Sequence, residues 1–510
     1  DLSLRSDRPE VDSEQRLRVH GALSNRPSDT LNVEMRDVLL YPLGELASLP
    51  RPLGGRVTGD IAVTGGWTQP QVRSAFSVDR LSFDRRILGD LSVQTRLRPG
   101  TPALFVDAAL TPGPASLERL SGPPLVPNGP RRIEGNRLSV TGRVRLPGLA
   151  PDADTDPLDL TVNVERADLF FFEYIFEETL ANVRGYTAGT IQIGGRFTKP
   201  IFDAEMEVRE GRFALPKFGL KYGISGPVTV DRRGIHLGEV SVTDDDGSAA
   251  LTGSVLFNDY KYFSFDLSGR LDAITIIDVE NARDLPFYGT IRASGPASLT
   301  GPLSDATLRS PGARTTPDSE LFIPVSEGEV EDGTGFIVFA DSTGKVPDLR
   351  DLTQRDNILS DRPAGEPTFL NGLGIDINVI APEESTVNLV FDPVVGDVVT
   401  AVGSGRVQLQ RQEGEFLVYG DFNVTEGTYL FTAGEVFVRR FNIDEGTISW
   451  DGPPINARLD LKADYRTRAS PAGLPGYDDS AGRIPVRVLL DISGRVETPR
   501  VDLGLALVRD

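Results

Sequence analysis

Apolar and polar residues alternate strictly along the C-terminal part of the chain. Between Ile455 and Arg466, every second residue is apolar or aromatic, and the residues between them are polar or charged. Apolar residues also recur at every second position in Ile484–Ile492 and Val501–Leu507. A period of two predicts β-strands with one apolar face, whereas a helix requires a period of about 3.6. The apolar face of such a sheet must be covered.

The preceding chain repeats one order of elements, which predicts an all-β protein with a few short helices. Each unit has a strand, a short helical segment, a second strand and a turn ending in proline. The expected helices are Val38–Leu49, Leu169–Val183 and Ile274–Arg283. The expected divisions are repeat units at 1–158, 159–262 and 263–374, the last ending in a polar loop at 341–366, and a C-terminal β region at 375–510.

The composition supports an all-β protein and argues against several classes of function. The 510 residues include 53 Gly and 37 Pro, as expected for many strands joined by turns. The net charge of −21 disfavours binding to nucleic acid or to an anionic membrane surface. The chain has no cysteine, which excludes disulfides, thiolate catalysis and cysteine-ligated zinc. No apolar run reaches the roughly 18 residues of a membrane-spanning helix. We expect the chain to be a segment of a larger protein.

Few residues suggest catalysis. The only two histidines, His20 and His236, are far apart in sequence, and a structural role in a strand or turn is expected for His236. The Asp244–Gly247 stretch resembles a solvated hairpin tip more than a calcium loop, because it lacks spaced oxygen ligands. The acidic Leu169–Val183 segment favours packing against the sheet over lying on a membrane. We therefore expect no enzymatic activity, no metal and no cofactor.

A longer motif carries a family resemblance. Its glycines, aromatics and alternating apolar residues begin with Gly420-x-Phe422-x-Val424-x-x-Gly427-x-Tyr429-x-Phe431 and continue with Arg440-Phe441-x-Ile443-x-x-Gly446-x-Ile448-x-Trp450-x-Gly452-x-Pro454-x-x-Ala457-x-Leu459-x-Leu461-x-Ala463-x-Tyr465. This pattern resembles the C-terminal region of the TamB family, within the AsmA-like and bridge-like lipid-transfer proteins. The long polar loop at 341–366 departs from the family pattern.

The resemblance implies an elongated, U-shaped sheet, or β-taco, with a continuous apolar groove. It implies a periplasmic segment of an inner-membrane-anchored protein in the bacterial envelope, with phospholipid acyl chains as ligand and an Omp85-type outer-membrane β-barrel as partner. The expected function is phospholipid transport between the two membranes. The expected groove lining is Phe422, Val424, Tyr429, Phe431, Ile455, Ala457, Leu459, Leu461, Tyr465, Ile484, Val486, Val488, Leu490, Ile492, Val501, Leu503 and Leu505.

Three alternatives remain open. Periodicity by itself favours apolar faces that pack on each other as an ordinary core. A chaperone or scaffold for outer-membrane β-barrel and autotransporter assembly would instead use an exposed sheet edge for strand addition. A polysaccharide-degrading β-solenoid would need a carboxylate cluster and a short, regular coil period, and the sequence shows neither.

Overall fold

The protein is built almost entirely of β-strands. The computed structural model describes residues 2–6, 15–24, 26, 29–40, 53–65, 70–83, 86–98, 103–113, 135–145, 157–175, 180–197, 199–258, 262–280, 287–324, 372–392, 397–412, 415–433, 437–470, 483–496 and 498–507. Within them, 25 strands belong to one hydrogen-bonded sheet. The prediction of an all-β protein with a continuous sheet is confirmed.

The chain divides into two units. Unit 1 contains Asp1–Ala214, Lys221–Thr243 and Ala250–Phe263, and unit 2 contains Leu215–Leu220, Asp244–Ala249 and Ser264–Asp510. The division into four parts expected from the sequence stays a prediction. The strands of the first half are β1 (Leu2–Ser6), β2 (Gln15–Gly21), β3 (Leu31–Leu39), β4 (Leu53–Thr64), β5 (Gln71–Phe83), β6 (Arg86–Leu97), β7 (Ala103–Thr111), β8 (Arg137–Arg145), β9 (Leu158–Asp168), β10 (Ala181–Arg196), β11 (Lys199–Leu215), β12 (Leu220–Val230), β13 (Gly234–Thr243) and β14 (Ser248–Asn258).

The second half continues in the same manner, and the described residues also contain short helices. Its strands are β15 (Tyr262–Val279), β16 (Tyr288–Pro302), β17 (Thr307–Thr315), β18 (Glu320–Pro324), β19 (Gly374–Asp392), β20 (Asp397–Gln412), β21 (Glu415–Ala433), β22 (Phe437–Gly452), β23 (Arg458–Ala469), β24 (Ile484–Arg495) and β25 (Arg500–Leu507). The helices are α3 (Phe171–Ile175), η2 (Pro216–Phe218) and η3 (Pro454–Asn456).

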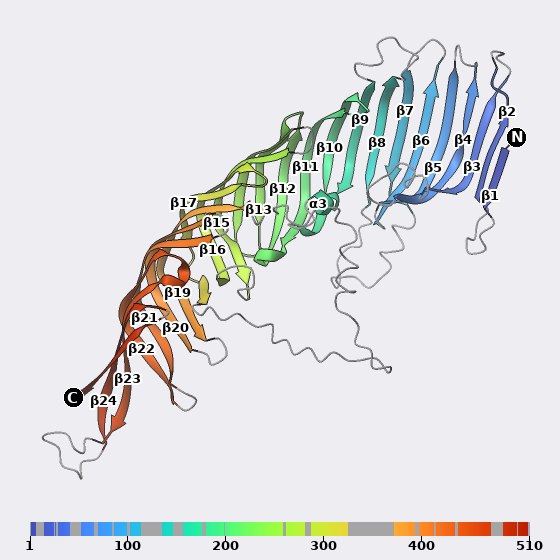
Figure 1. Cartoon of the computed structure of the whole chain (residues 1–510). Helices are drawn as coiled ribbons and strands as arrows, with labels where there is room; N and C mark the ends of the chain where they lie inside the picture. The colour runs from blue at the N-terminus through green and yellow to red at the C-terminus, as the bar shows by residue number, and fades with distance from the viewer. Residues whose placement is uncertain are drawn as a thin grey trace, which may run out of the picture. The chain divides into compact units, whose positions relative to one another are not determined.

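Consecutive strands pair antiparallel through most of the sheet, so chain order is also spatial order within each unit (Figure 1). The pairing differs at one place in unit 2, where β17 and β18 meet β19, and we call this place the parallel joint. β17 and β18 both pair with β16 antiparallel and with β19 parallel. Parallel neighbours cannot be joined by a tight hairpin. Accordingly, 49 residues separate Pro324 from Gly374 (374 − 324 − 1 = 49).

In unit 1, one face of the sheet is apolar across nine strands, β3 to β11. Because antiparallel partners face the same side, the register aligns their side chains in rows across the strands. The central row is Met35, Gly59, Phe76, Val93, Ala108, Val140, Val162, Ile191 and Ala204. The matching row on the opposite face is Glu34, Asp60, Ala75, Gln94, Asp107, Thr141, Thr161, Gln192 and Asp203.

The helix predictions need correction. In the described part of Leu169–Val183, Phe171–Ile175 are helical, 176–179 lie outside the described residues, and Ala181–Val183 already belong to β10, where Ala181 pairs with Ala214. In the third expected helix, residues 274–279 are strand β15, because the run Ile274–Ile277 is β-branched throughout and pairs with β16. Val38 and Leu39 of the first expected helix lie in β3, and 41–49 lie outside the described residues.

Candidate functional site

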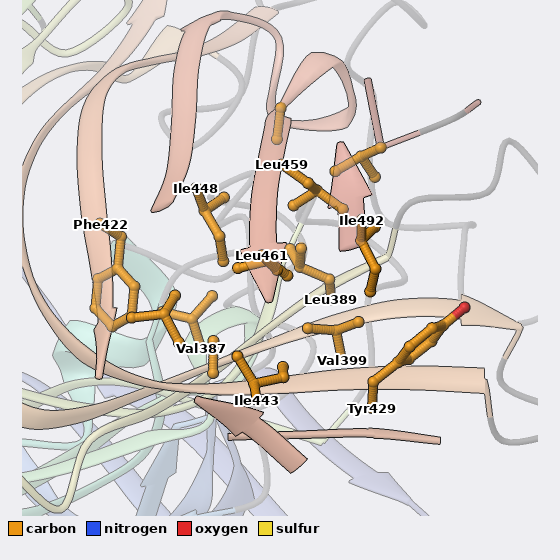
Figure 2. Packing of buried hydrophobic residues seen from close by; sticks show 14 of the residues in the cluster. Val387, Leu389, Val399, Phe422, Tyr429, Ile443, Ile448, Leu459, Leu461 and Ile492 are labelled. Carbon is orange, nitrogen blue, oxygen red and sulfur yellow. The ribbon is translucent and has the colours of Figure 1, made fainter. Parts of the chain in front are cut away.

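The largest group of buried side chains among the described residues lies in unit 2, where these side chains pack against one another. Leu461 of β23 is fully buried, lies opposite Ile492 of β24, and lies opposite Gly446 of β22 on its other side. Ile448 of β22 is also fully buried and lies opposite both Leu459 and Phe422. Figure 2 shows these side chains pointing toward one another from several strands. We call this group the unit 2 core.

Most of the groove-lining residues expected from the sequence lie in or against this core. Its buried members among them are Phe422, Val424, Tyr429, Ala457, Leu459, Leu461, Leu490 and Ile492. Partly buried against it are Tyr465, Val488 and Val501. In the described conformation these side chains contact protein, so a lipid chain could enter only if they moved apart. Their role as a groove lining stays a prediction.

The remaining expected lining residues differ in how far they are exposed. Val486 of β24 is buried and Ile484 half-buried, while Ile455 is half-buried in η3 rather than in a strand. Leu503 and Leu505 of β25 are 65% and 79% exposed. The side chain of Phe431 lies outside the described residues. β25 therefore presents apolar side chains that the rest of the described chain does not cover.

The lining expected from the sequence omits 12 of the 20 buried residues of the unit 2 core (20 − 8 = 12). Val387 and Leu389 of β19 and Val399 and Ala401 of β20 are all buried in it, together with Ile323 of β18. The alternation that marks these residues was present in the sequence, since polar Asn388 and Thr400 separate the apolar pairs. What the sequence did not show is the parallel joint that brings β18 beside β19.

The apolar face of unit 1 is the second candidate site, and it also went unrecognised in the sequence. In its central row, Ala108, Val162 and Ala204 are 7–8% exposed, whereas the larger Phe76 and Ile191 are only half-buried. In the unit 2 core, by contrast, large side chains such as Leu389, Ile448 and Leu461 are fully buried. The unit 1 face thus offers apolar surface that the described chain covers only in part.

Helix α3 is held against the end of this face. Leu169 and Phe170, directly before it, are both buried. Glu173 pairs with Arg86 of β6 at 2.6 Å, and its other carboxylate oxygen accepts the backbone N–H of Val183 at 2.6 Å. One carboxylate therefore fixes α3 both to β6 and to β10. This contact is consistent with the expectation that the segment packs against the sheet.

The polar residues singled out in the sequence, His236 and the Asp244–Gly247 stretch, each belong to a hydrogen-bonded set, one in each unit. In unit 1, the ring nitrogens of His236 lie 2.8 Å from Ser254 Oγ and 3.1 Å from Asp231 Oδ1. The hydrogen bond from His236, aided by the N–H of Arg233, lowers the pKa of Asp231 from 3.8 to about 2. His236 thus has the structural role expected for it at a strand and turn.

In unit 2, the aspartate-rich tip is tethered rather than simply solvated. Burial acts to raise the pKa of Asp244, but N–H groups of Thr275, Asp246 and Gly247 donate to its carboxylate and the pKa is lowered overall. Asp246 pairs with Arg292 of β16. Within the described residues, no group of three or more histidine or carboxylate side chains is arranged to hold a metal ion.

A family model matches the second half of the chain. The family model of the TamB C-terminal domain matches residues 239–506, which is more than half of the 510 residues. The chain belongs to the TamB family. The match includes the parallel joint and the whole unit 2 core. TamB-family proteins act in biogenesis of the bacterial envelope and work with outer-membrane partners, and this role extends to the present chain at that level.

Two further observations complete the comparison. No curated protein matches the chain. In the described part of this TamB-family chain, no helix is both long and apolar enough to cross a membrane.

Proposed function

We propose that this TamB-family chain is a periplasmic segment of a conduit that carries phospholipid between the inner and outer membranes. The observation that supports the proposal is the apolar face of unit 1, which runs without a charged residue through its central row across nine strands. At about 4.8 Å between strands, eight spacings extend over about 38 Å. The side chains of this row would line one stretch of a U-shaped groove.

The chemistry of an acyl chain suits such a face. Each CH₂ group transferred from water to an apolar surface contributes about 0.8 kcal/mol, so affinity grows with contact length and needs no directed polar contacts. Sliding along the row then changes the binding free energy little. The phosphate head group would stay in water, and the polar row on the opposite face would keep the segment hydrated. In this proposal the chain binds lipid and performs no catalysis.

In this proposal the unit 2 core is closed to lipid in the described conformation. Leu389, Ile448, Leu461 and Leu490 are fully buried, and no acyl chain fits between them without separating the strands that carry them. In this proposal lipid occupies the apolar face of unit 1, and lipid enters the unit 2 core only if its strands separate. We further propose an inner-membrane anchor for the full protein and an Omp85-type outer-membrane β-barrel as its partner.

Native mass spectrometry with lipid extraction of the purified chain tests the conduit. The wild type should carry several phospholipids, and Ile191→Asp should lose them because it places a charge in the apolar row. Gln192→Asp is the matched control, since it adds the same side chain at the next residue on the polar face. A folded wild type without lipid, or an Ile191→Asp variant with the full lipid load, would refute the proposal.

Exposure of β25 favours a second candidate function, a scaffold for outer-membrane barrel assembly. Leu503 and Leu505 lie uncovered on a strand that pairs on one side with β24. A client strand added along the other side would cover them. A photo-crosslinker at Leu505 should then react with a purified unfolded barrel protein, and one at Asp502, on the opposite face, should react much less. Equal reaction at both positions would reject strand addition.

A further inference from the structure

A cluster of arginines lies on the polar face of unit 1, opposite the apolar rows. Arg73 of β5 lies directly opposite Arg96 of β6, and Phe105 of β7 lies between Arg96 and Arg143 of β8. The Phe105 side chain is 39% exposed, and the guanidinium of Arg98 lies 5.7 Å from the centre of its ring. Arg96, Arg98 and Arg143 therefore lie beside one exposed aromatic ring, and Arg73 lies one strand farther away.

The charge of this cluster is unusual for the chain. The whole protein has a net charge of −21, and like charges directly opposite each other on neighbouring strands destabilise a sheet. Arg143 is balanced by Asp159, whose carboxylate lies 2.5 Å away. Arg73 and Arg96 form no ion pair with any residue that the structure describes. An anionic ligand would remove the repulsion between them.

The surface at the cluster is hollowed. A hollow of about 590 Å³ is lined by Gln94, Arg96, Arg98, Phe105, Val106, Asp107, Thr141, Gly142 and Arg143. Gln94, Asp107 and Thr141 add hydrogen-bond acceptors and donors to a floor otherwise formed by arginine and phenyl groups. Asp107 would repel a purely anionic ligand, but its carboxylate can accept hydrogen bonds from hydroxyl groups. The hollow thus combines sites for acidic groups, for hydroxyls and for one flat apolar surface.

From this combination we infer that the hollow binds an acidic saccharide, a sugar chain that carries carboxylate or phosphate groups. Arg96 and Arg143 flank Phe105 two strand spacings apart, about 10 Å. Arg96 can bind one acidic group with two parallel hydrogen bonds, and Arg143, whose Nε and Nη2 donate to Asp159, can donate from Nη1 to a second acidic group. The C–H face of a sugar ring lies on Phe105 between them. Its hydroxyls donate to Asp107 and Gln94. An acidic peptide would satisfy the arginines but would leave Asp107 and Phe105 without partners.

Isothermal titration of the purified chain tests this site with defined probes. Tetragalacturonate supplies carboxylates on a sugar chain, glucose 1,6-bisphosphate supplies phosphates on a sugar ring, and an oligoglutamate of equal charge supplies carboxylates without sugar. The wild type should bind at least one sugar probe at least tenfold more tightly than the oligoglutamate. Whichever sugar binds more tightly supports the proposal and identifies the acidic group.

Variants separate the saccharide site from general attraction of anions. The double variant Arg96→Gln/Arg143→Gln should weaken sugar binding at least tenfold, and Phe105→Ala should weaken it at least threefold. The control Arg196→Gln/Arg209→Gln removes the same charge from exposed positions of β10 and β11 and should bind as the wild type does. All three positions of the site are exposed, so the variants should melt close to the wild type. Oligoglutamate binding as tight as the sugars, or equal losses in the control, would overturn the proposal.

Discussion

Replacing one fully buried leucine of the unit 2 core tests whether that core is the chain's own packing. Leu461 has no exposed surface and lies between Gly446 and Ile492 on the neighbouring strands. The substitution Leu461→Ala removes three buried carbons, worth about 2.4 kcal/mol at about 0.8 kcal/mol each. The cavity left behind adds to this loss, so we expect a decrease of about 3–4 kcal/mol in the free energy of unfolding.

Tryptophan fluorescence during urea unfolding measures the effect. Trp450 is 7% exposed and belongs to the core, and replacing Trp67 with Phe leaves it as the only indole in the chain. With a denaturant slope of about 3 kcal/mol per molar urea, the loss corresponds to a midpoint lower by about 1 M. The matched control is Leu505→Ala, because Leu505 is 79% exposed and its removal should change stability by no more than about 0.5 kcal/mol. Equal midpoint shifts for the two variants would refute a packed core.

Two further predictions concern polar contacts in unit 1. The hydrogen bond from His236 lowers the pKa of Asp231 to about 2, so the contribution of this pair to stability is complete above pH of about 4 and is lost as the pH falls toward 2. The difference in melting temperature between the wild type and Asp231→Asn should therefore shrink as the pH falls from about 4 to about 2. A constant difference would contradict the pairing. Glu173→Ala leaves the N–H of buried Val183 without its acceptor and should lower the free energy of unfolding by about 1–3 kcal/mol. Hydrogen exchange at Val183 should become faster. The control Glu165→Ala removes an exposed ion pair and should leave that exchange unchanged.

The sequence predicted the strands well, because the alternation of period two directly reflects which face each side chain occupies. It predicted the charged face less well. Arg458, Asp460 and Lys462 of β23 are exposed as expected, but Asp464 is 2% exposed and pairs with Arg487 at 3.0 Å. Alternation assigns a residue to a face and does not reveal what covers that face.

The helices and the candidate site were harder to predict for a related reason. Leu169–Val183 has helical spacing, yet Ala181–Val183 gain more from pairing in β10 than from an extra helical turn. The C-terminal motif drew attention to unit 2, where the apolar residues are most regular. Regularity and burial coincide there because two sides of the sheet pack together, while the more open apolar face of unit 1 has weaker local patterns.

The parallel joint between β17, β18 and β19 has a consequence for the order of folding. Many antiparallel neighbours elsewhere are linked by short turns, and the longest such connection, from Thr111 of β7 to Arg137 of β8, has 25 residues (137 − 111 − 1 = 25), whereas β19 must find β18 across 49 residues. Relative to a four-residue turn, closing that loop costs about 2 kcal/mol more in chain entropy. Local hairpins on either side should therefore form first, and the union of β19 with β17 and β18 should be the slow step that completes the sheet.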